Sequence, residues 1–144
     1  MKPNSNEPMM DDESLNDERV AELLSFLPFF EKSQGKKVIK WLGGEKTEDG
    51  STVWPFPDYP NEVILFFKVA SQPWWSRSYL GIKLWPLLEA GLEGIDMNTA
   101  KSVLTCFARG ERFCDGLWVD LVESGALVLL LKKIGQLWSE KKDQ

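Results

Sequence analysis

The chain has 144 residues, 43% of them hydrophobic and 27% charged, values that are typical of one globular domain with its own core. It contains no histidine, which excludes Ser-His-Asp and Cys-His nucleophile pairs and metal sites built on imidazole. The first 18 residues hold six acidic side chains and one basic one, and the rest holds 16 of each, so the net charge of −5 belongs to the N-terminal segment. An electrically neutral body argues against a nucleic-acid groove.

Residues 1–13 show no hydrophobic period, so we expect an acidic disordered tail, followed by one helical domain over residues 14–140. The tail lacks the apolar stretch of a signal peptide, and the longest apolar run, residues 126–131, is too short to cross a membrane. The only cysteines are Cys106 and Cys114, and two isolated thiols are typical of a reducing compartment. We therefore expect a cytoplasmic protein.

The first part of the chain combines a helix with an irregular segment. A capping box at Ser14 predicts a helix that continues to Phe30, with Pro28 ending or kinking it. The helical period then disappears. Residues 38–42 and 52–54 flank glycine-containing turns and predict a small hairpin, and residues 54–60, with three prolines, predict an extended segment that carries several rings.

Helical periods return after residue 60 and continue to the C-terminal region. The predicted helices cover residues 60–70, 76–90 or 78–90, 96–107, 113–122 and 127–138. In the second of these we expect a kink at Pro86, in the third an N-cap at Asp96, and after the fourth a left-handed cap at Gly125. The chain therefore predicts a mainly α fold: a single compact bundle of about five to six helices, with an irregular or β-hairpin insertion between the first two.

The most distinctive motif is Arg109-Gly-Glu-Arg-Phe-Cys-Asp-Gly116. On a helix, Arg109 and Arg112 would share one side and could grip a phosphate or carboxylate. Asp115 falls on the side of Arg112, and Glu123 returns to nearly the same direction. These four residues are candidates for an anion site or for an internal ion-pair cluster that fixes how two helices pack, and the second role is the commoner one for such groups.

This motif and three other stretches resemble an uncharacterised bacterial domain family of unknown function. The other stretches are Leu23-Leu-Ser-Phe-Leu-Pro-Phe-Phe30, Trp41-Leu-Gly-Gly44 and Gly125-Ala-Leu-x-x-Leu-Leu-Lys-Lys. The resemblance covers nearly all of residues 19–138, although residues 71–79 fit loosely. It implies a short, stand-alone, mostly helical protein, of a kind often encoded near mobile elements. It transfers no activity to any residue.

Aromatic side chains concentrate in the connections between predicted helices. Trp and Tyr anchor protein interfaces because they bury a large area with few rotatable bonds. We therefore take five rings as interface candidates: Trp54, Phe56, Tyr59, Trp74 and Trp75. The competing interpretation places these rings in a small core that covers the long connection.

These features favour a non-enzymatic binding or regulatory protein that acts through protein–protein contacts, in a role such as an inhibitor or an immunity-type factor of a mobile element. The alternative is a small-molecule- or nucleotide-binding enzyme or sensor that holds an anion between Arg109 and Arg112. We expect no catalytic residue, cofactor or metal. The expected partner is another protein, with a second copy of the chain as a further candidate, and neither a membrane nor nucleic acid is expected.

Overall fold

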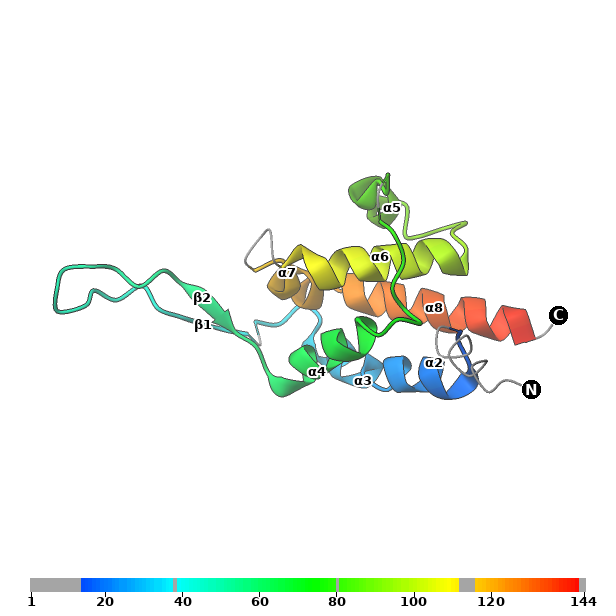
Figure 1. Cartoon of the computed structure of the whole chain (residues 1–144), viewed down its shortest axis with the longest axis horizontal. Coiled ribbons are helices and arrows are strands. Elements are labelled where there is room, and N and C mark those ends of the chain that lie inside the picture. Colours follow the sequence, from blue (N-terminus) through cyan, green and yellow to red (C-terminus); the bar gives the residue numbers. More distant parts are fainter. Residues whose placement is uncertain (1–13, 38, 80, 112–115, 143–144) are drawn as a thin grey trace, which may run out of the picture.

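The computed structural model describes residues 14–37, 39–79, 81–111 and 116–142, and Figure 1 shows their arrangement. The fold is mainly α, with one hydrophobic core and a small two-stranded antiparallel sheet, as the sequence predicts. The helices are α2 (Asp17–Leu24), α3 (Leu27–Ser33), α4 (Asn61–Ala70), α5 (Leu84–Glu89), α6 (Met97–Gly110), α7 (Leu117–Glu123) and α8 (Ala126–Lys142). The strands are β1 (Lys40–Leu42) and β2 (Phe56–Asp58), which lie between α3 and α4.

The first predicted helix is a pair of short helices, α2 and α3, which together correspond to one kinked element. Asn16 caps α2 in place of the predicted Ser14, and its side-chain oxygen accepts a hydrogen bond from the Arg19 amide at 2.8 Å. Pro28 lies in the first turn of α3. Because a proline there cannot donate to the carbonyl of Leu24, the break falls ahead of Pro28 and not at it.

The helix predicted from Ser76 or Ser78 begins later, since α5 starts at Leu84. Pro86 lies in the first turn of α5. Backbone amides in the first turn make no hydrogen bond within the helix, so a proline there costs the helix none. A proline in that position starts a helix and does not kink a longer one, so the prediction of a kink at Pro86 is wrong. The predicted cap of α6 is confirmed, because the Asp96 side chain accepts from the Thr99 amide at 2.8 Å.

A hairpin is present between α3 and α4, but its returning strand is β2 and not residues 52–54. The register pairs Lys40 with Asp58, Trp41 with Pro57 and Leu42 with Phe56. A two-stranded sheet tolerates Pro57 because each strand has one edge that pairs with nothing in the sheet. An isolated bridge between Lys46 and Thr52 continues the same register outward. Residues 40–58 therefore form one long arm that extends away from the helices (Figure 1).

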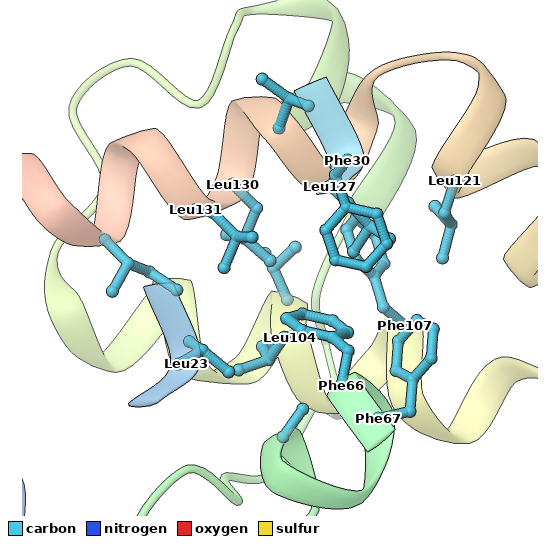
Figure 2. Packing of buried hydrophobic residues seen from close by; sticks show 14 of the residues in the cluster. Leu23, Phe30, Phe66, Phe67, Leu104, Phe107, Leu121, Leu127, Leu130 and Leu131 are labelled. Atoms are coloured by element: carbon cyan, nitrogen blue, oxygen red, sulfur yellow. The ribbon is translucent and has the colours of Figure 1, made fainter. Parts of the chain in front are cut away.

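Helix α8 is the centre of the bundle and packs against α2, α3, α6 and α7. Its inward side chains Leu127, Leu130 and Leu131 are fully buried and lie among rings and leucines from the surrounding helices (Figure 2). Two of those rings, Phe30 and Phe66, meet edge to face with centroids 4.9 Å apart. The core therefore unites helices from both halves of the chain.

Candidate functional site

The two faces of the arm carry different side chains. Since paired residues of an antiparallel ladder point to the same side, Leu42 and Phe56 share one face, and Trp41 and Pro57 share the other. Trp54 lies two residues before Phe56, on the part of the arm between this ladder and the outer bridge of Lys46 with Thr52. We call Leu42, Trp54 and Phe56 the aromatic strip.

The aromatic strip is open to solvent. The exposed fraction is 84% for Trp54, 45% for Phe56 and 43% for Leu42. On the opposite face, the ring of Trp41 lies against Gly116, where an added Cβ would come within 3.0 Å of the indole. Trp41 is nevertheless 50% exposed, so the arm touches the start of α7 at its root and leaves Leu42, Trp54 and Phe56 open to solvent.

The root of the arm is tied to the body by Glu111. Its Oε2 accepts hydrogen bonds from the Tyr59 hydroxyl at 2.8 Å and from the Gly116 amide at 3.1 Å, and its Oε1 accepts from the Trp118 amide at 3.0 Å. This carboxylate thus caps the N-terminus of α7 and also holds the residue that follows β2. The Tyr59 ring lies 5.3 Å from that of Trp118. The sequence gives only a weak signal for Glu111: it is an acidic residue five positions before Gly116, the glycine that precedes α7.

Trp74 and Trp75 belong to the helical body. Trp75 is fully buried and is part of the core, whereas Trp74 is partly exposed and packs against that core. The Arg19 guanidinium lies 3.8 Å from the centroid of the Trp74 ring, which is the geometry of a cation–π contact. A fully buried ring cannot meet a partner, so we assign Trp75 to the core. Among the five predicted rings, Trp54 and Phe56 are the ones that stand exposed on the arm.

The Arg109–Gly116 motif joins two separate helices. Helix α6 ends at Gly110 and α7 begins at Leu117, after a glycine with φ of +92° that does not continue a right-handed helix. The helical spacing that grouped Arg109 with Glu123 therefore does not apply. Glu123 ends α7, and its backbone carbonyl accepts from the Gly35 amide at 2.8 Å. Arg112 and Asp115 lie outside the described residues, so a cluster that includes them stays a prediction.

Beside Arg109, the structure places a different arginine, Arg77. Both side chains line one surface pocket together with Thr105. Thr105 lies one turn before Arg109 on α6, and its Oγ1 accepts from the Arg77 amide at 3.0 Å. The sequence carries no signal for Arg77 at this place, because it lies in an irregular segment 32 positions from Arg109 and only the packing of that segment on α6 joins them.

Other chemistry is sparse in the part of the chain that the structure describes. No group of three or more His, Cys, Asp or Glu side chains there could hold a metal ion. Burial raises the pKa of the Cys106 thiol, which makes it a weaker nucleophile than an ordinary cysteine at neutral pH. None of the described helices is both long enough and apolar enough to cross a membrane.

Comparison with protein-family models matches residues 15–140 to a family of unknown function, DUF6508. The chain belongs to this family. In this DUF6508 member, the matched residues cover the arm and the helical bundle except for the last two residues of α8, so the match includes the aromatic strip and the root at Glu111. No curated protein and no solved structure matches the chain significantly.

Proposed function

We propose that this DUF6508 member is a non-enzymatic binding module that engages another protein through the aromatic strip. The observation that carries the proposal is the 84% exposure of Trp54 on an arm that stands out from the helical body (Figure 1). Burying a large ring contributes roughly 1.5–3 kcal/mol, and exposed apolar side chains that adjoin one another tend to mark contact sites. Leu42 and Phe56, which pair across the ladder, are exposed on the same arm and add to the apolar surface that a partner can bury.

The partner that fits this face is a protein with an apolar groove that admits an indole ring. Trp is among the residues that most often dominate interface energies, and it does so where its surroundings exclude water. The role that we propose for the contact is regulatory, as an inhibitor or an immunity-type factor of a mobile element, in the cytoplasm. Support for that role comes from the family resemblance, the neutral body and the exposed strip.

The test compares Trp54→Ser with a matched control, Trp85→Ser. Trp85 is another exposed indole, at 62%, and it lies on α5 away from the arm (Figure 1). A protein captured by the wild-type chain is identified by mass spectrometry and purified, and its Kd is measured for all three chains by calorimetry. We expect Trp54→Ser to weaken binding by about 30-fold, as a hot spot worth about 2 kcal/mol would, and Trp85→Ser to leave the Kd nearly unchanged.

Two results would contradict the proposal. One is equal binding of the wild-type chain and Trp54→Ser, or an equal loss in both variants, since the strip would then contribute nothing of its own. The other is a dimer in sedimentation velocity that Trp54→Ser abolishes, because a second copy of the chain would then occupy the strip in place of another protein.

A further inference from the structure

We propose that Arg77 and Arg109, with the hydroxyl groups beside them, form a binding site for the phosphate group of a small molecule. The site lies where residues 76–79 pack on α6, and it does not include the aromatic strip. This inference goes beyond the protein contact proposed above, and neither depends on the other.

The surface here is hollowed in two adjoining steps. An open pocket of about 380 Å³ is lined by Ser76, Arg77, Ser78, Tyr79, Thr105 and Arg109. A smaller, more enclosed hollow of about 130 Å³ shares Ser76, Thr105 and Arg109 with it. Arg109 therefore reaches both spaces. Arg77 lines the open pocket and not the enclosed hollow, so a phosphate that contacts both arginines lies in the open pocket.

The segment that carries Arg77 is held firmly on α6. Its amide donates to Thr105 Oγ1 at 3.0 Å, and the Thr105 hydroxyl in turn donates to the Lys101 carbonyl at 2.8 Å. One residue further along, the Ser78 carbonyl accepts from Ser102 Oγ at 2.7 Å. These bonds use the backbone of residues 77 and 78 and not the Arg77 guanidinium. A site whose backbone is already ordered loses less entropy when a ligand binds.

Arg77 and Arg109 bring two positive charges to this pocket. Among the described residues, the structure records no ion pair for Arg77 or Arg109. The pKa of the neighbouring Lys101 is lowered, first by burial and then by the like charges of Arg77 and Lys141. An anion bound beside Arg77 would offset the repulsion between Arg77 and Lys101.

The number of donors favours phosphate over carboxylate. Two guanidinium groups offer up to ten N–H donors in planar forks, and the hydroxyls of Ser76 and Tyr79 line the same pocket. Ser76 Oγ makes only long bonds, of 3.3 and 3.5 Å, to backbone carbonyls. A carboxylate has two oxygens to accept from these groups, whereas a phosphate monoester has three and carries more charge at neutral pH.

The experiment measures binding of two named probes, inorganic phosphate and adenosine monophosphate, to the full chain by calorimetry at low ionic strength. The variants are Arg77→Ala and Arg109→Ala, and the matched control is Lys46→Ala, which removes the same charge from the outer part of the arm. We expect each arginine variant to weaken binding by about tenfold or more, as the loss of a charge-assisted hydrogen bond does, and the control to change it by less than about twofold. Adenosine monophosphate binding more tightly than phosphate would identify a monoester as the ligand, and equal binding would identify the free anion.

Location and folding are read out separately. Amide chemical shifts of Ser76 and Thr105 should move when the probe is added, and melting curves should show that the variants are folded. Arg109→Gln, which retains most of the side chain, replaces Arg109→Ala if the latter unfolds. The proposal is overturned if the wild-type chain binds neither probe, if Lys46→Ala weakens binding as much as the arginine variants, or if the shifts move elsewhere.

Discussion

Glu111 satisfies three donors at the point where α6, α7 and the arm meet. Two of the donors are backbone amides, of Gly116 and Trp118, which belong to the start of α7 and have no partner within that helix. The third is the hydroxyl of Tyr59, which follows β2. A single carboxylate thus determines both where α7 begins and where the arm is anchored.

We therefore expect Glu111→Ala to lower the free energy of unfolding by about 2–3 kcal/mol, because it leaves these donors without their acceptor in a partly buried place. Glu111→Gln should cost less, since its amide keeps one acceptor oxygen. Urea denaturation measures both, with Glu93→Ala as the control, because Glu93 is exposed and its side chain makes no recorded contact among the described residues. Equal stability of Glu111→Ala and Glu93→Ala would show that water replaces the carboxylate at no cost.

At the scale of elements, the outer end of the arm is a turn closed by its own side chains. The Asp49 carboxylate accepts from the Thr47 hydroxyl and, at 3.0 Å, from the Ser51 amide. The Thr47 amide donates to the Ser51 carbonyl at 2.7 Å. Gly50 has φ of +88°, a conformation that glycine adopts without strain. The turn is therefore specified locally, by residues 47–51 alone.

These bonds lower the pKa of Asp49 from 3.8 to about 2, with the Thr47 hydroxyl as the largest cause. Because the folded pKa lies below the unfolded one, the turn is stabilised by the carboxylate above about pH 4 and loses that stabilisation as the pH falls towards 2. We expect carboxyl NMR titration to give a pKa near 2 for the wild-type chain. Thr47→Ala should raise this pKa towards its ordinary value, while Thr52→Ala should not. An ordinary pKa in the wild-type chain would mean that the turn is not formed in solution.

At the scale of the whole molecule, the arm and the helical body have separate roles. In the part of the chain that the structure describes, the hydrophobic core takes its members from the helices and their connections, and residues 40–58 contribute no side chain to it. The arm touches the body mainly at its root, through Trp41 against Gly116 and through Tyr59 on Glu111. Stability of the body should therefore not depend on the outer arm.

Replacing residues 44–54 by Asn-Gly, a two-residue hairpin turn, should change the Tm by less than about 2 °C, because 1 kcal/mol corresponds to roughly 4 °C in a domain of this size. The same change removes Trp54 and should abolish binding of the protein partner. Trp75→Ser, which empties a fully buried site, is the positive control and should cost about 3 kcal/mol or more. Thermal melts followed by circular dichroism compare the two, and a similar loss in both would show that the arm contributes to the core.

Local features of the sequence were sufficient for much of this architecture. The apolar period of 3.6 residues and the cap at Asp96 predict α6, and similar periods predict α4 and α8, because helical hydrogen bonds join residues four apart. The presence of a hairpin between the first helices also followed from local turn chemistry. Helix starts were less accurate where a proline occupied the first turn, as at Pro28 and Pro86, since local rules do not say whether a proline kinks a helix or begins one.

Only the tertiary structure decided which residues meet. Trp75 and Trp54 both lie in proline-containing connections, yet one is fully buried and the other is 84% exposed. Arg77 joins Arg109 because an irregular segment packs on α6. Both outcomes depend on contacts between distant parts of the chain. The packing of those parts determines which side chains are buried and which arginines lie together, and no local pattern in the sequence encodes that packing.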